Sequence, residues 1–378
     1  MYKTGVIKTS RKENERRIPI YPEHLAWIDE NVRKNLWFET GYGKDYGLSD
    51  SYFIEMTGGV MPREEIFRQC ELVILPKPVA QDLEELHSGQ ILWGWPHCVQ
   101  QKPITQPAID NKLTLIAWEA MHSWSAAGEK RMHVFYKNNE LAGYAAIHHA
   151  LQLTGRDGFY GPRRQVVVLG YGSVSRGAIH ALHGRGFNNI LVLTSRPTHL
   201  VGDQHPDCYY AQMADSPDGK INVVERNGKS RPLVDVLADA DIIYNGVLQN
   251  TNKPMMFVQP DETGRLKPRS LIIDVSCDEG MGFLFAKPTS FEHPVFTIGN
   301  GIIYYSVDHT PTYLWDAASR EISRALIPYL EMVMSGPTAW RQNETIRRAV
   351  EIENGVIRNA NILSFQNRAP EYPHQEMM

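Results

Sequence analysis

The sequence predicts an α/β protein built from two doubly wound, mostly parallel sheets. Short apolar runs alternate with amphipathic stretches almost from the first residue, and a second series of this kind begins near residue 165. Parallel strands need a crossover connection, usually a helix, so the alternation indicates βαβ units. The length of 378 residues fits two to three domains, at about 150 residues each.

The first series contains five expected strands and three expected helices. The strands are residues 4–8, 36–39, 72–75, 91–95 and 114–118. The helices are residues 22–30, 62–69 and 81–87. Two of these helices begin at proline, which suits a first helical position because its missing N–H would be unpaired there anyway.

The second series follows an expected bridging helix at residues 141–153 and a turn-rich linker at 154–164. Its strands are residues 165–170, 190–193, 241–244 and 271–275, with a helix at 173–182. Residues 197–230 are rich in Asp, Pro and Gly, so we expect a surface excursion with a hairpin turn at 226–229. An amphipathic helix at 311–334 precedes a polar tail. The expected domains are residues 1–140, completed by about 311–378, and residues 141–310.

Composition excludes several classes of protein. The net charge is −4, from 39 Lys and Arg against 43 Asp and Glu, so no basic field is present to hold nucleic acid or an anionic membrane. No apolar run approaches the roughly 18 residues of a membrane span, and the basic start lacks the apolar core of a signal peptide. We therefore expect a cytoplasmic protein with neither nucleic acid nor membrane as partner.

Metal and disulfide chemistry are not expected either. The four cysteines are far apart and form no CxxC pair, so they are expected to be reduced thiols rather than a disulfide framework or a zinc site. His180 and His183 are one helical turn apart. No carboxylate ligand is obvious beside them, so no metal is expected.

A glycine-rich turn between a buried strand and a helix predicts a dinucleotide site. Its sequence runs from Gly170 through Tyr171, Gly172, Ser173 and Val174 to Ser175. The first glycine makes a tight turn, the second lets backbone N–H groups approach a pyrophosphate, and the third position must be small. The helix N-terminus favours the anion. The alternative is a tight turn that binds no ligand.

The end of the next expected strand selects the nucleotide. An NAD site carries Asp or Glu there for the ribose hydroxyls, whereas an NADP site accommodates the 2′-phosphate with Arg. Here Ser195 and Arg196 follow the strand, so NADPH is expected and NADH is less favoured. Arg196 could instead be a solvated loop charge. Asn245 and Gly246, directly after another expected strand, complete the expected cofactor-binding set.

Several separated motifs support a resemblance to a known superfamily. They are Asn14–Pro19, Pro76–Pro78, Gly94–His97, Tyr136–Asn138, Ala142–Ala145, the glycine turn, Ile273–Asp278 and Val307–Pro311. In this order and spacing, the chain resembles the alanine dehydrogenase and saccharopine dehydrogenase superfamily from about residue 3 to about residue 328. Within that superfamily it is most similar to the N5-(carboxyethyl)ornithine synthases.

The resemblance implies two Rossmann-like domains and a C-terminal helical segment that returns to the first domain. It also implies reduction of an imine formed between an α-keto acid and an amino group. Arg17, Lys77 and His97 match the residues that surround the keto acid in this family, and Asp278 matches a carboxylate from the cofactor domain. The resemblance also implies a homo-oligomer.

The expected reaction needs these residue types for physical reasons. Arg17 offers a planar, forked donor for a carboxylate, and His97 can give and take protons near neutral pH. Lys77 can polarise the keto oxygen or hold the carboxylate. Glu119 could meet a substrate ammonium or be a surface charge. His97 could also be a core histidine, and Asp278 could simply cap a turn.

The leading hypothesis is an NADPH-dependent reductive condensation of a small α-keto acid, pyruvate by resemblance, with the side-chain amine of ornithine or lysine. An alanine dehydrogenase-like or saccharopine dehydrogenase-like enzyme is the alternative within the same chemistry. A dinucleotide-binding subunit or sensor without turnover is the alternative outside it. The retained Lys77, His97 and Asp278 argue against a protein without turnover.

Overall fold

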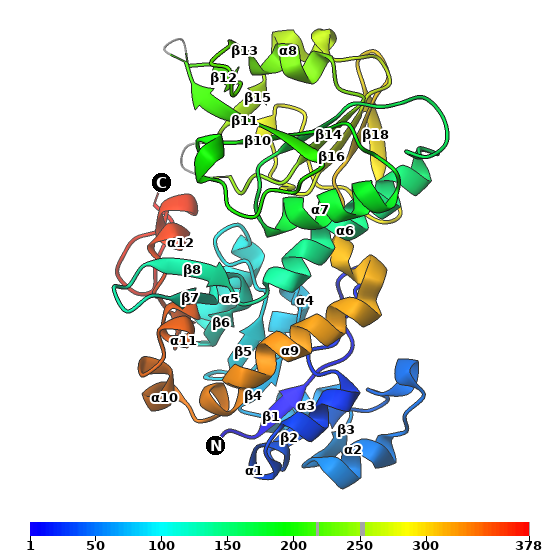
Figure 1. Ribbon diagram of the computed structural model, residues 1–378. Helices are drawn as coiled ribbons and strands as arrows, with labels where there is room; N and C mark the ends of the chain where they lie inside the picture. The colour runs from blue at the N-terminus through cyan, green and yellow to red at the C-terminus, as the bar shows by residue number, and fades with distance from the viewer. Residues whose placement is uncertain (217–218, 250–253, 378) are drawn as a thin grey trace. The chain divides into compact units, whose positions relative to one another are not determined.

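The computed structural model describes residues 1–216, 219–249 and 254–377, and it divides the chain into two compact units. Unit 1 comprises Met1–Tyr136 and Trp315–Met378, and unit 2 comprises Lys137–Leu314. Both units contain a mostly parallel sheet with helices (Figure 1). The predicted fold class, two doubly wound α/β domains, is confirmed.

Unit 1 contains an eight-stranded sheet in the order β21-β20-β6-β5-β4-β1-β2-β3. Its first six strands along the chain are parallel, and β20 joins β6 in the antiparallel direction. The strands are β1 (Thr4–Val6), β2 (Leu36–Glu39), β3 (Gly59–Met61), β4 (Leu72–Ile74), β5 (Ile91–Gly94), β6 (Thr114–Ala117), β20 (Val350–Glu353) and β21 (Val356–Ile357), with a separate hairpin of β7 (His122–Trp124) and β8 (Lys130–His133).

Two apolar cores cover the two faces of this sheet, since successive strand residues point to opposite sides. Val6, Ile74 and Trp93 pack in the core that includes α9, whereas Val73 and Leu92 pack in the other. The helices are η1 (Pro22–Trp27), α1 (Glu30–Arg33), η2 (Lys44–Tyr46), α2 (Asp50–Met56), α3 (Arg63–Gln69), α4 (Ala80–Leu83), α5 (Lys102–Asp110), η3 (Trp118–Ala120), α9 (Trp315–Met334), α10 (Pro337–Arg341), α11 (Glu344–Ala349) and α12 (Ala360–Phe365).

Unit 2 contains a nine-stranded sheet in the order β13-β12-β11-β10-β9-β14-β16-β19-β18. The strands are β9 (Val166–Leu169), β10 (Ile190–Thr194), β11 (Cys208–Asp215), β12 (Ile221–Val224), β13 (Ser230–Pro232), β14 (Ile242–Asn245), β16 (Leu271–Asp274), β18 (Val295–Ile298) and β19 (Ile302–Tyr305), with a small sheet of β15 (Met256–Val258) and β17 (Gly282–Phe283). The helices are α6 (Tyr136–Leu153), α7 (Ser173–Gly184), η4 (Thr198–Leu200), α8 (Leu233–Ala238), η5 (Pro260–Arg265) and η6 (Thr310–Leu314).

The two parallel sheets share one strand order. From β11 to β19 in unit 2, the third, second, first, fourth, fifth and sixth parallel strands lie side by side, and the same order runs from β3 to β6 in unit 1. This is the order of a dinucleotide-binding α/β fold. The sequence showed only a general likeness between the two halves.

Several predicted elements differ from the structure. The expected surface excursion at residues 197–230 is wrong, because β11, β12 and the first residue of β13 lie in it; residues 217–218 fall outside the described part. The predicted turn is confirmed, since Gly228 has φ +82° and its N–H donates to the carbonyl of Glu225, while the Glu225 N–H donates to the carbonyl of Lys229. The expected helix at 22–30 is instead a 3₁₀ helix followed by α1, and the helix α5 was not predicted.

Within the described residues, no helix is both long and apolar enough to span a bilayer.

The helices α6 and α7 cross at two glycines. A Cβ placed on Gly143 would lie 1.9 Å from the carbonyl oxygen of Val174, and one on Gly177 would lie 1.8 Å from that of Glu140. Both obstacles are backbone atoms, so a side chain at either glycine would push the helices apart. The close crossing fixes α7, the helix that starts at the glycine-rich turn, against α6.

Substitution of Gly177 should therefore destabilise the protein. Gly177→Ala should lower the free energy of unfolding by roughly 1–3 kcal/mol, because overpacking displaces backbone. Gly184→Ala on the same helix is the matched control: its Cβ would meet nothing within 4 Å in the described structure, so alanine should be neutral or stabilising there. Urea denaturation of both variants measures the difference, and equal stabilities would contradict the crossing.

Candidate active site

Each sheet has one point where the strand order reverses. In unit 2 it lies between β9 and β14, where Leu169 is in register with Asn245. In unit 1 it lies between β1 and β4. Ligands of open α/β sheets bind outside the carboxyl ends of the strands at such a point, because the flanking connections diverge there. The expected site residues can be located relative to these two points.

The glycine-rich turn follows β9 at the reversal point of unit 2. Gly170 has φ +84°, a left-handed conformation that favours glycine. Gly172 is the N-cap of α7, and a Cβ there would meet nothing within 4 Å among the described residues. The space beside Gly172 and the backbone N–H groups of Ser173 and Val174 at the first turn of α7 fit a pyrophosphate.

Two small residues close the packing behind this turn. Ser175 is fully buried, and its Oγ has no hydrogen-bond partner among the residues described. A Cβ on Gly246 would lie 2.5 Å from that oxygen. Ser175 and Gly246 therefore serve close packing between α7 and the end of β14. This is the role expected of the third position in the glycine motif.

Ser195 and Arg196 follow β10, the neighbour of β9, and both are exposed. The carbonyl of Ser195 accepts a hydrogen bond from Gln212 at 3.1 Å, which holds the segment against β11. Over the described residues, Arg196 makes no ion pair. In a dinucleotide-binding fold the adenosine ribose binds at the end of this second strand. A guanidinium that forms no ion pair within the protein is suited to bind the 2′-phosphate there.

Asn245 lies in a buried polar network instead of at the surface. Its Nδ2 donates to Oδ1 of Asp274 at 3.0 Å, and its Oδ1 accepts from the backbone of Val247 at 3.1 Å. Tyr304 donates to the other oxygen of Asp274 at 2.7 Å. Burial raises the pKa of Asp274 to about 6 despite these donors. The Asn245 side chain thus shapes the loop after β14.

Asp278 lies just beyond β16 and is half-buried. The hydroxyl of Ser276 donates to Oδ2 of Asp278 at 3.0 Å. Burial raises the pKa of Asp278, and the Ser276 hydrogen bond partly offsets this effect. The preceding residue, Cys277, has φ +58°, so a sharp backbone turn presents Asp278. Asp278 belongs to unit 2, whereas Arg17, Lys77, His97 and Glu119 belong to unit 1.

In unit 1 the structure brings together Lys77, His97 and Glu119 from the ends of three adjacent strands. Nζ of Lys77 lies 3.2 Å from Nε2 of His97. A lysine ammonium has only donors, so Nε2 of His97 is the acceptor when Lys77 is charged. The His97 Nδ1 is 3.9 Å from Oε1 of Glu119. The three residues form a connected acid–base group.

Glu119 also fixes the backbone of His97. The His97 N–H donates to Oε1 of Glu119 at 2.6 Å, and His97 has φ +49°. A left-handed conformation in a residue other than glycine is strained and persists only where neighbouring groups hold it. Glu119 therefore positions His97, a role that the sequence did not suggest; a substrate contact of Glu119 remains a prediction.

Arg17 is buried and paired. Its backbone N–H, its Nε and its Nη2 all donate to Glu15, and the guanidinium lies 5.0 Å from the ring centroid of Trp95. Glu15 was not predicted as a site residue, although it stands only two positions away. Because Glu15 occupies part of the guanidinium fork, Arg17 offers fewer donors to a substrate carboxylate than a solvated arginine would.

A second residue that sequence reasoning missed is Glu351, on β20. Glu351 is 4% exposed, and one oxygen of Glu119 and one of Glu351 are buried without a hydrogen-bond partner in the parts described. Burial and then the charge of Glu351 raise the pKa of Glu119 well above its usual value, while Lys77 and the His97 N–H oppose the rise. Burial raises the pKa of Glu351 as well. No local signal distinguishes Glu351 from other glutamates in the polar tail.

Comparison with known proteins identifies the family. The model of the alanine dehydrogenase/PNT N-terminal domain matches residues 5–142, and that of the C-terminal domain matches residues 144–360. The chain belongs to the alanine dehydrogenase/PNT family. The predicted resemblance is thereby confirmed, and the chain is an oxidoreductase that uses a nicotinamide nucleotide.

The relatives include an N(5)-(carboxyethyl)ornithine synthase and alanine dehydrogenases. An N(5)-(carboxyethyl)ornithine synthase of Clostridium botulinum is 27% identical over 82% of this chain and 89% of its own length. An alanine dehydrogenase of Mycobacterium tuberculosis is 23% identical over 93% of both chains. A solved L-alanine dehydrogenase has the same fold, with a TM-score of 0.73 and 18% identity over 96% of this chain and 98% of its own.

The neighbouring carboxyls of Glu119 and Glu351 predict a pH dependence of stability. Because the folded pKa of Glu119 lies above the unfolded value of about 4.3, the folded state holds the proton more tightly. The free energy of unfolding should then fall as pH rises above the unfolded pKa of about 4.3 and through the higher pKa of the folded state. Glu351→Gln removes one of the two carboxyls and its repulsion of Glu119, so the free energy of unfolding should decrease less with pH. The difference should be about 1.4 kcal/mol for each tenfold decrease in the proton affinity of Glu119.

Glu353→Gln on the same strand is the matched control, because Glu353 is half-exposed and pairs with Arg358. Urea denaturation across the pH range measures all three proteins. If Glu351→Gln keeps the pH slope of the wild type, the two glutamates do not interact as described.

Proposed function

We propose that this protein catalyses the NADPH-dependent reductive condensation of a small α-keto acid, pyruvate in the first instance, with the side-chain amine of ornithine or lysine. The observation that carries the proposal is the pair of Lys77 and His97, 3.2 Å apart at the carboxyl ends of adjacent strands, with His97 held by Glu119. The synthase relatives at 27% and 24% identity support the substrate class.

Each residue of the pair has one task in the proposed reaction. Lys77 binds the oxygen of the keto group and polarises it, because an ammonium is a compact point charge with three donors. His97 accepts the proton that the attacking amine must lose and returns it when water leaves. Arg17, which is braced by Glu15 and Trp95, orients the keto acid.

The amine needs its own recognition, since it carries a carboxylate and an ammonium besides the reacting nitrogen. Glu119 is one candidate for the ammonium, though its raised pKa and its bond to His97 favour the positioning role. Asp278 is half-buried, and burial raises its pKa. It remains a proposed acid–base residue through its match to the family motif.

NADPH is the proposed cofactor. Gly170, Gly172, Ser173 and Val174 would hold its pyrophosphate, and Ser195 with Arg196 its 2′-phosphate. When bound, the reduced nicotinamide supplies the hydride. Asn245 and Gly246 shape the loop at the same strand-order reversal, at the end of β14.

Replacement of Arg196 should weaken the binding of NADPH but not that of NADH. Arg196→Ala removes a charge-assisted contact to the 2′-phosphate and should cost roughly 1.5–3 kcal/mol of NADPH affinity, while NADH binding should barely change. Fluorescence titration with both nucleotides measures the effect, and NADH is the internal control. Equal losses for both, or tighter NADH binding by the wild type, would contradict NADPH as cofactor.

The choice of amine tests the reaction itself. Ammonia lacks the remote groups whose binding orients the nucleophile, and well-oriented attack is worth several kcal/mol. Enzyme, NADPH and pyruvate should therefore give little oxidation until ornithine or lysine is added. Mass spectrometry should then show the amine enlarged by a carboxyethyl group.

Two other results would replace the proposal. Oxidation with ammonia that equals oxidation with the diamino acids, together with accumulation of alanine, would make the protein an alanine dehydrogenase. Turnover only with 2-oxoglutarate and lysine would make it a saccharopine-forming enzyme. A mixture in which no keto acid and amine pair supports oxidation, although the nucleotide binds, would indicate a nucleotide-binding subunit.

A further inference from the structure

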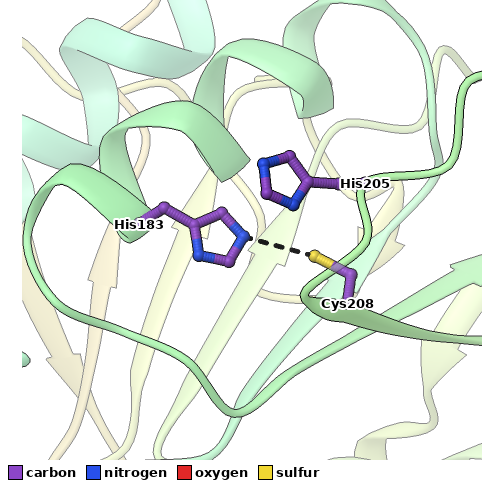
Figure 2. A group of neighbouring side chains, drawn as sticks. All are labelled: His183, His205 and Cys208. Atoms are coloured by element: carbon purple, nitrogen blue, oxygen red, sulfur yellow. Dashed lines mark hydrogen bonds between the residues drawn. The ribbon is translucent and has the colours of Figure 1, made fainter.

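Three side chains of metal-binding type meet in unit 2, away from the glycine-rich turn. His183 lies near the C-terminal end of α7, whereas His205 and Cys208 lie on the segment that leads into β11 and at its first residue. Figure 2 shows the thiol of Cys208 directed at the ring of His183, with His205 beside both. One potential ligand atom from each residue lies within 4.8 Å of the other two.

The separation of sulfur and nitrogen already matches a bound zinc ion. Sγ of Cys208 lies 3.5 Å from Nε2 of His183. Zinc binds sulfur at about 2.3 Å and imidazole nitrogen at 2.0–2.1 Å in tetrahedral geometry, which places those two ligand atoms about 3.5 Å apart. His205 is stacked on His183, with ring centroids 4.2 Å apart. It has to rotate out of the stack to bring a nitrogen to the ion.

The surroundings favour a cation. The carboxylate of Asp207 acts electrostatically on both His183 and Cys208. All three ligand residues are half-exposed, so an ion can enter from solvent. The histidine pair that the sequence suggested, His180 with His183, is not the cluster.

We propose that His183, His205 and Cys208 form a Zn²⁺ site with water as the fourth ligand. On binding, the Cys208 thiol loses its proton to solvent and a zinc–sulfur bond forms, with no change of oxidation state. Imidazole and thiolate together suit zinc rather than magnesium or calcium. Because the ligands come from α7 and from the start of β11, the ion ties the helix after the glycine-rich turn to the strand beyond Arg196.

The proposed metal ion would hold the segment between β10 and β11, which other contacts fix only in part. Tyr171 donates to the carbonyl of Asp203 at 2.5 Å, and Arg176 donates to the carbonyls of Gly202 and Asp203 at 3.2 and 3.3 Å. These bonds fix the middle of the segment between β10 and β11 to the glycine-rich turn and to the first half of α7. A metal at His183, His205 and Cys208 fixes its far end to the last turn.

The test uses the full-length, reduced protein after removal of metal with a chelator. Titration with Co²⁺, which accepts the same ligand types, should give one equivalent of tight binding and a thiolate-to-metal charge-transfer band. Zn²⁺ should abolish that band and raise the melting temperature, since a ligand that binds only the folded state stabilises it. Both effects should be lost in Cys208→Ser and in His205→Gln and kept in His199→Gln, an exposed histidine of the same segment.

Circular dichroism establishes that each variant is folded, and His205→Gln provides a second variant if Cys208→Ser does not fold. No uptake of Co²⁺ or Zn²⁺ by the reduced wild type would overturn the proposal. A thiolate band that survives Cys208→Ser, or uptake that His205→Gln leaves unchanged, would also overturn it. The cofactor and substrate experiments do not affect this result, because none of the three ligands has a role in the proposed reaction.

Discussion

The parallel direction of neighbouring strands is the constraint on which the chemistry of this protein depends. In a parallel sheet every strand ends at the same edge, so residues that follow different strands are brought together regardless of their separation in sequence. Lys77, His97 and Glu119 meet for this reason, since β4, β5 and β6 are adjacent and parallel. The glycine-rich turn and the loop after β14 are neighbours in unit 2 for the same reason.

The second determinant is the set of buried polar contacts that hold these strand ends. Glu15 braces Arg17, Glu119 holds the strained backbone of His97, and Asp274 gathers the loop after β14 with the turn after β16. Glu15 and Asp274 each accept more than one hydrogen bond, whereas Glu119 accepts the one from the backbone of His97. A buried carboxylate is costly unless it is paired, so the energetic requirement of these groups also fixes the geometry of the residues around them.

The sequence was informative where the signal was local. The glycine-rich turn, Lys77 and His97 stand directly after apolar strands, and a resemblance to the family added their order along the chain. Glu351 could not be found in this way, because its partner Glu119 lies in a distant part of the sequence and the pairing of β20 with β6 is antiparallel. The helix α5 was missed because Pro103 and Pro107 lie within it, and proline usually ends a helix.

Unit 1 is discontinuous, and this affects how the protein is made. The strand β6 emerges from the ribosome long before β20, which pairs with it, and all of unit 2 is synthesised in between. At about 5–20 residues per second the interval is roughly ten seconds or longer. During that time the edge of β6 has no neighbour and the carboxylate of Glu119 lacks Glu351. Until β20 has been translated, the nascent chain therefore has an unpaired strand edge, to which chaperones or strands of other chains can bind.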